Sequence, residues 1–130
     1  KLNGDAIHTP LGKKSYETPR AMSLGEIETT VNDYRKAALN AKAAGFSGVE
    51  VHGANGYLIN QFLDSRTNRR QDSHGGSIEN RSRFLFEVLD EIVQRIGPDH
   101  PLGLVNDPAL THDDGGQLAG AVGAPAGGRL

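Results

Sequence analysis

The sequence predicts an α/β fold with parallel strands, and three observations indicate it. Apolar residues recur at helical spacing in two long segments, 24–44 and 77–96. Each of these segments is followed by a short apolar stretch of strand length, at 47–52 and 102–105. Only a few residues connect each helix to the strand after it, which is typical of a parallel α/β unit. Two strands cannot close a sheet, so we expect part of a larger one.

The first expected element after the N-terminal segment is the helix 24–44. Residues 1–22 contain two prolines and two glycines without any apolar period, and they predict a loop with room for a short irregular hairpin. Ser23 and Glu26 then form the pattern of a capping box, in which hydroxyl and carboxylate accept backbone N–H groups. Gly45 is expected to end the helix in a left-handed conformation. The apolar stripe consists of Ile27, Val31, Tyr34, Ala38 and Ala41.

The predicted strand 47–52 alternates between apolar and polar residues. Val49 and Val51 share one face, and Glu50 and His52 share the other, because side chains alternate along a strand. This pattern suits a strand that packs on a helix with one face and lines a functional interior with the other.

A long polar loop, 53–76, separates this strand from the second helix and can contain a helical turn at 57–62. Ser77 is the expected N-cap of the second helix, and Gly97 with Pro98 ends it. The apolar stripe of that helix consists of Phe84, Leu85, Val88, Leu89, Ile92 and Ile96. In residues 109–130, glycine and alanine fill eleven of 22 positions, so no core face can be drawn and we expect disorder.

Composition excludes several classes of function. The net charge of −2 gives no overall attraction to nucleic acid or to an acidic membrane, and no run of about 18 apolar residues is present. The absence of cysteine excludes disulfides and thiolate chemistry. We therefore expect no nucleic-acid and no membrane partner. The absence of cysteine does not assign a compartment, and a cytoplasmic location is a separate expectation.

Three smaller features are predicted to be structural. Five arginines are interleaved with acids and favour ion pairs that order the loop over nucleic-acid binding: Arg66, Arg69, Arg70, Arg81 and Arg83. Gly75-Gly76-Ser77 before a helix could cradle a phosphate, but this pattern is weak. His112-Asp113-Asp114 is equally weak as a metal site, so no metal is predicted.

The block H-G-A-N-G-Y with Q-F-L, followed by G-G-S-I-E-N-R, lies in the run AAGFSGVEVHGANGYLINQFLDSRTNRRQDSHGGSIENRSRFLFEVLDEIV. This run closely resembles the old yellow enzyme family of flavin-dependent ene-reductases and NADPH dehydrogenases, and the similarity covers about residues 10–96. The resemblance implies a (β/α)8 TIM barrel that holds FMN. Because such barrels need about 250 residues, residues 1–108 would be a partial barrel with about two strands and two helices.

The resemblance also implies roles for the polar side chains that follow the strand. His52 and Asn55 would bind the activating oxygen of an α,β-unsaturated carbonyl or nitro substrate, and Tyr57 would be the catalytic proton donor. Hydrogen bonds to that oxygen stabilise the charge that develops during hydride transfer, and a phenol stays protonated at neutral pH. NADPH would reduce the FMN. By composition alone, a histidine at a strand end or a tyrosine in a turn is more often structural.

The sequence departs from the family after the second helix. The family strand reads G-[IVL]-R-[LV]-S-P with a flavin-contacting arginine, whereas Val105 stands at that position here. Beyond Pro108 nothing resembles the family, which suggests a shifted reading frame, a mis-joined exon or low-quality sequence that resequencing would reveal. The alternative hypothesis is therefore a truncated or degenerate non-catalytic α/β fragment, inactive on its own.

Overall fold

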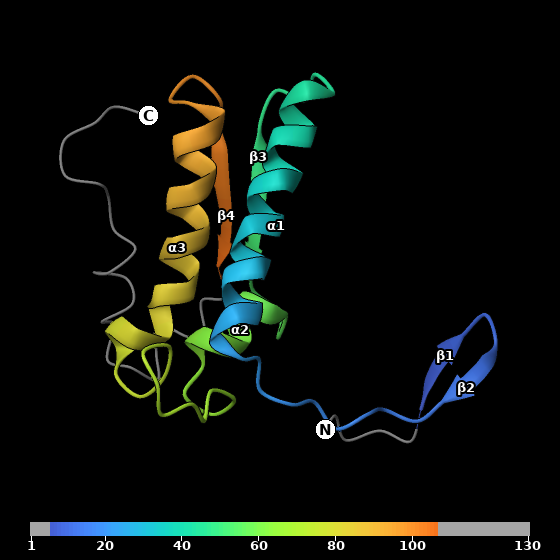
Figure 1. Ribbon diagram of the computed structural model, residues 1–130. Coiled ribbons are helices and arrows are strands. Elements are labelled where there is room, and N and C mark those ends of the chain that lie inside the picture. The colour runs from blue at the N-terminus through green and yellow to red at the C-terminus, as the bar shows by residue number, and fades with distance from the viewer. Residues whose placement is uncertain (1–5, 107–130) are drawn as a thin grey trace.

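The computed structural model describes residues 6–106, and these fold into two layers. Strands β3 (Val49–Gly53) and β4 (Leu102–Asn106) pair in parallel. Helices α1 (Leu24–Ala43) and α3 (Ile78–Ile96) lie side by side on one face of this pair (Figure 1). The α/β prediction is confirmed.

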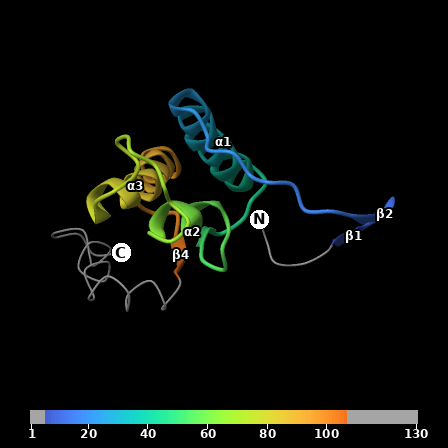
Figure 2. The same ribbon diagram turned by 90° about the horizontal axis from the view of Figure 1, so that it is seen from below.

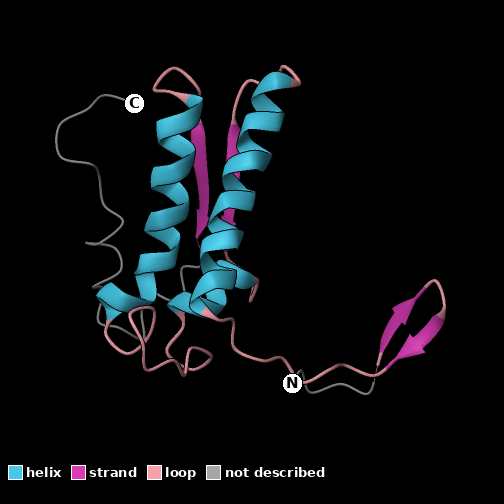
Figure 3. Ribbon diagram, viewed as in Figure 1, coloured by secondary structure: helices cyan, strands magenta, loops and turns pink. Residues whose placement is uncertain are grey.

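Two smaller elements complete the described part of the chain. Helix α2 (Leu58–Leu63) lies at the end of β3, next to the long loop that leads to α3 (Figure 2). The antiparallel hairpin of β1 (Ile7–Thr9) and β2 (Gly12–Lys14) stands apart from the two layers (Figure 3). The described residues thus hold four strands and three helices. The hairpin and α2 lie where an irregular hairpin and a helical turn were expected, and β3, β4, α1 and α3 form the parallel α/β unit.

The start of α1 confirms the capping box. The Glu26 N–H donates to the Ser23 hydroxyl at 3.2 Å, and the Ser23 N–H donates to the Glu26 carboxylate at 2.8 Å. A hydrogen bond from the Arg20 guanidinium, assisted by those from Ser23, lowers the pKa of Glu26 to about 2. Gly45, with φ of +85°, follows the Ala44 C-cap, so the helix ends where the glycine predicts it.

The core lies between the helices and one face of the parallel pair. Val51 is buried, and its partner in the register, Leu104, packs against the same cluster. Phe84 is completely buried and packs on Phe62, with ring centroids 4.5 Å apart. Burial of such side chains removes apolar surface from water, which is the main favourable contribution to folding. The apolar stripes of both helices therefore face inward as predicted.

The opposite face of the parallel pair carries Glu50 and His52, and both are exposed. The register pairs them with Gly103 and Val105 of β4. No helix in the described part of the chain covers this face, since α1 and α3 lie on the other one (Figure 1). Parallel sheets are normally covered on both faces. The face of the strand pair that carries Glu50 and His52 is therefore open to packing against further parts of a larger fold.

Some predictions lie outside the described residues. They include the boundary at residue 108, the tail 109–130, and the weak metal pattern at 112–114. Within residues 6–106, no helix combines the length and the apolar character that crossing a membrane requires. The described residues also contain no group of three or more side chains that could hold a metal ion.

Candidate active site

The candidate site is built on the turn that follows β3. The Tyr57 N–H donates to the Ala54 carbonyl at 3.2 Å, which closes a four-residue turn. Its two central residues, Asn55 and Gly56, have φ of +58° and +75°. Two positive φ values in succession are the mark of a type I′ turn, for which Asn-Gly is the preferred dipeptide. Asn55-Gly56 is therefore the local sequence signal for this turn, which was not among the predicted elements.

The turn brings two of the three predicted side chains into contact. The rings of His52 and Tyr57 have centroids 5.1 Å apart and are tilted by 53°. Tyr57 is the N-cap residue of α2 and remains 62% exposed. Asn55, which lies between His52 and Tyr57 in the sequence, is exposed and has a left-handed backbone conformation. His52 is one of the last two residues of β3, and Asn55 and Tyr57 follow that strand, so all three lie near the C-terminal end of a parallel strand. Active sites of α/β barrels are built at this end.

Strand β4 comes close to this turn. A Cβ added to Gly53 would lie 2.9 Å from the Val105 carbonyl oxygen, so the two strands leave no room for a side chain there. Val105 pairs with His52 in the register, and neither strand contains a lysine or arginine. An apolar side chain offers no hydrogen-bond donor or positive charge to a flavin. The residue at this position therefore does not fit the flavin contact that the family resemblance implies.

Charged side chains hold the loop between α2 and α3. Arg70 makes two hydrogen bonds to Asp72, at 2.6 and 3.0 Å, and donates a third to the Met22 carbonyl at 2.6 Å. Arg81 is buried, with 7% of its surface exposed, and its Nε donates to the Leu63 carbonyl at 2.8 Å. Arg83 donates to the Ser73 carbonyl at 2.7 Å. These contacts support the loop-ordering interpretation for Arg70, Arg81 and Arg83.

The glycines before α3 are structural as well. A Cβ on Gly75 would lie 2.2 Å from the Arg70 carbonyl oxygen, so the backbone of the loop passes directly over this residue. Gly76 has φ of +84°, and its carbonyl accepts a hydrogen bond from Arg81 at 2.7 Å. Ser77 caps α3 by accepting from the Asn80 N–H. The segment Gly75-Gly76-Ser77 directs the chain into the start of α3, and this structural role accounts for its sequence without a bound phosphate.

We expect Asp72→Asn to reduce the dependence of stability on acid pH. The hydrogen bond from Arg70 holds the pKa of Asp72 below its usual value of 3.8. A lowered pKa means that the ionised form stabilises the fold above that usual value, and that this contribution is lost as pH falls through the folded pKa. The free energy of unfolding should therefore fall more between pH 6 and pH 3 in the wild type than in the variant. Urea titrations at several pH values measure this free energy. The same fall between pH 6 and pH 3 in both proteins would contradict the prediction.

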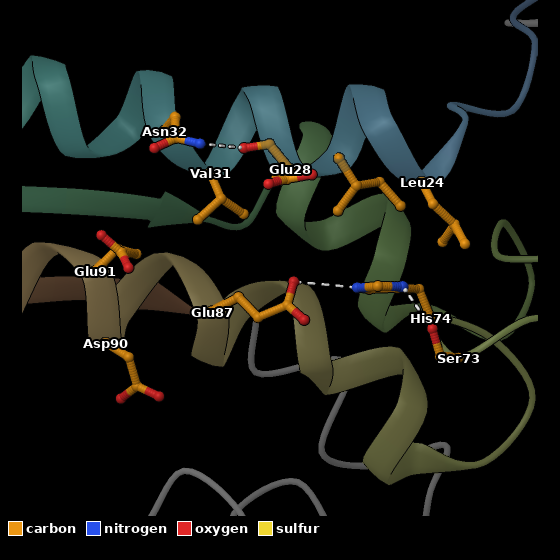
Figure 4. A pocket seen from close by; sticks show the side chains of 10 residues that line it. Leu24, Glu28, Val31, Asn32, Ser73, His74, Glu87, Asp90 and Glu91 are labelled. Atoms are coloured by element: carbon orange, nitrogen blue, oxygen red, sulfur yellow. Dashed lines mark hydrogen bonds and ion pairs between the residues drawn. The ribbon is translucent and has the colours of Figure 1, made fainter.

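A groove opens on the outer side of the helix layer, between α1 and α3 (Figure 4). His74 is buried there, and its Nε2 lies 3.1 Å from a Glu87 carboxylate oxygen. Glu28, Asp90 and Glu91 also line the groove. None of the predicted site residues takes part in it. The groove is thus separate from the turn after β3.

The comparisons with known proteins decide the family. The sequence pattern of the NADH:flavin oxidoreductase / NADH oxidase family matches residues 3–109. The chain belongs to this family. The resemblance to the old yellow enzyme family is thereby confirmed.

Relatives within the flavin oxidoreductase family share much of this segment. A probable flavin mononucleotide-dependent alkene reductase of Leishmania infantum is 58% identical over 99 residues, which are 76% of this chain and 27% of that protein. The 12-oxophytodienoate reductase 2 of Arabidopsis thaliana is 52% identical over 84 residues, or 65% of this chain and 22% of that protein. The chain therefore spans about a quarter of the length of these curated relatives.

Proposed function

We propose that the complete protein is an FMN-dependent ene-reductase of this family, and that residues 1–108 form part of its (β/α)8 barrel. The observation that carries the proposal is the turn after β3, which presents Asn55 and the contacting rings of His52 and Tyr57 at the C-terminal end of a parallel strand. The names of the relatives, an alkene reductase and an oxophytodienoate reductase, support the same class of reaction. The substrate would be an α,β-unsaturated carbonyl or nitro compound.

The three side chains have complementary tasks in this proposal. Reduction of an activated C=C bond adds a hydride at the β-carbon and a proton at the α-carbon. His52 and Asn55 donate hydrogen bonds to the substrate oxygen, where negative charge develops as the hydride arrives. Tyr57 donates the proton, because a phenol hydroxyl can act as a general acid.

FMN would supply the hydride when bound, with NADPH as the reductant. Because Val105 gives the flavin no donor, we propose that residues beyond this segment hold the cofactor. The contribution of this segment is then confined to the substrate oxygen and the proton. This division is consistent with cofactor enzymes in general, in which the cofactor does the redox chemistry and the protein positions the substrate.

The test is enone reduction by the complete protein. Purified with FMN, it should oxidise NADPH in the presence of 2-cyclohexenone, and the double variant His52→Ala, Asn55→Ala should lose roughly 100-fold in kcat/KM. Asn32→Ala is the matched control, since Asn32 lies on α1 and bonds to the Glu28 carbonyl. If the complete protein binds no flavin and does not oxidise NADPH with 2-cyclohexenone, the proposed function is wrong.

A second candidate concerns the 130-residue chain by itself. The uncovered face of β3 and β4, together with Val105, favours a non-catalytic fragment that does not bind FMN tightly alone. We expect a flavin titration of this chain, followed by flavin fluorescence, to show no saturable binding. Tight binding together with a cooperative thermal transition in circular dichroism would contradict this expectation.

A further inference from the structure

Two side chains of α2 hold the turn on which the candidate site is built. The Gly56 N–H donates to Asn60 Oδ1 at 2.6 Å, and Gln61 Nε2 donates to the Gly56 carbonyl at 2.7 Å. The backbone N–H and the carbonyl of Gly56, which lies between Asn55 and Tyr57, are therefore both hydrogen-bonded. The directions of the Asn55 and Tyr57 side chains depend on the backbone conformation at Gly56, because the dihedral angles there set the course of the chain on both sides.

The two bonds differ in their surroundings. Asn60 is only 6% exposed, whereas Gln61 is exposed. A hydrogen bond away from water is electrostatically stronger than one that water competes for. Ile59 and Phe62 of the same helix belong to the core. Asn60 thus ties the turn to the packed part of the molecule, while Gln61 adds a weaker contact at the surface.

The orientation of the Asn60 amide follows from its partner. The Gly56 N–H can only donate, so the acceptor Oδ1 faces it and Nδ2 points elsewhere. Among the described residues, Nδ2 is buried and has no hydrogen-bond partner. A buried donor without a partner opposes folding, because the loss of its hydrogen bonds to water is not compensated. Stability of α2 alone does not account for a buried asparagine at this position, since an apolar side chain would avoid that cost.

We propose that Asn60 is a positioning residue of the candidate active site: it holds the Gly56 N–H and so fixes Asn55 and Tyr57 toward the substrate. This inference rests on the proposed function. An amide suits the task better than a carboxylate, because a buried negative charge would oppose the charge that develops on the substrate oxygen. Asn60 itself touches no substrate in this proposal and acts through the turn.

The decisive variant is Asn60→Leu in the complete protein, which removes the acceptor while keeping a similar volume. Reoxidation of the reduced flavin by 2-cyclohexenone, measured per bound flavin in single turnovers, should slow at least tenfold. Reoxidation by molecular oxygen should stay unchanged, since it needs neither Asn55 nor Tyr57. Asn60→Asp, which keeps an acceptor toward Gly56, should restore part of the enone rate. A loss confined to protein yield, or equal changes with both oxidants, would overturn the proposal.

Asn68→Leu is the matched control. Asn68 donates to the Phe62 and His74 carbonyls, at 2.7 and 2.8 Å, and so holds the following loop rather than the turn. It should lower stability without changing the ratio of the two reoxidation rates. The same shift of that ratio in both variants would assign the effect of Asn60 to general destabilisation.

Hydrogen exchange provides a readout that is independent of activity. The Gly56 N–H should exchange markedly faster in Asn60→Leu than in the wild type, and NMR of the complete protein measures it. Unchanged exchange would overturn the proposal even if activity fell. If the wild type reduces no enone at all, the proposed function fails, and the exchange rate of Gly56 then decides the positioning role separately.

Discussion

Replacing Tyr57 by phenylalanine in the complete protein should slow enone reduction by about 10²- to 10⁴-fold, the usual contribution of a positioned general acid. The ring is retained, so the contact with His52, whose ring centroid lies 5.1 Å away, should persist. Reduction of FMN by NADPH should be unchanged, because it requires no proton at a substrate carbon. Stopped-flow measurements of the two half-reactions, each normalised to bound flavin, separate the effects.

Tyr34→Phe is the matched control for this prediction. Tyr34 lies half-buried on α1 and packs against Phe84 with ring centroids 6.3 Å apart, on the helix layer rather than at the turn. Loss of its hydroxyl should leave both half-reactions unchanged. If Tyr57→Phe retains full enone turnover, Tyr57 is not the proton donor, and solvent or another residue supplies the proton.

The second large effect is expected on stability, from Gly75→Ala. The added Cβ would lie 2.2 Å from the Arg70 carbonyl oxygen and 2.5 Å from the Arg70 Cβ, so backbone would have to move. Movement of Arg70 also disturbs its bond to the Met22 carbonyl, which joins the loop to the segment before α1. Overpacking costs about 1–3 kcal/mol and occasionally more, and the clash with backbone atoms places Gly75→Ala at the upper end of that range. Urea unfolding of the complete protein measures the loss.

Two other glycines provide graded controls for Gly75→Ala. At Gly76 nothing lies within 4 Å of an added Cβ, but φ is +84°, so alanine should cost about 1–2 kcal/mol of backbone strain. At Gly25, inside α1, an added Cβ also meets nothing within 4 Å and no left-handed φ is required, so alanine should stabilise by up to about 1 kcal/mol. Equal effects at all three positions would show that close approach of the loop is not the cause.

The elements that were predicted correctly are those with local causes. The capping residue Ser23 and the stop at Gly45 define α1 to within a residue, because hydrogen bonds and dihedrals at helix ends involve near neighbours. Strand β3 was expected from Ser47 but begins at Val49, where the backbone N–H reaches the Pro101 carbonyl. That contact joins residues far apart in the sequence, and alternation along one strand cannot indicate where pairing starts.

The candidate site divides in the same way. The motif indicated His52, Asn55 and Tyr57, and their roles remain predictions. It did not indicate that Val105 stands beside His52, because the register between β3 and β4 decides that. It also did not single out Asn60, whose polar side chain in a short helix has no periodicity to reveal it.

By itself, the sequence determined the helix ends, the inward faces of both helices, the α/β class and the family, since each depends on residue types at fixed local spacing. Only the tertiary structure decided which side chains of the long loop bond to one another, why Gly75 admits no side chain, and that Asn60 binds Gly56 beneath the turn. Gly56 and Asn60 are only four residues apart, but whether such near neighbours meet depends on the irregular backbone of the turn or loop between them. Residue types at a given spacing do not encode the course of that backbone.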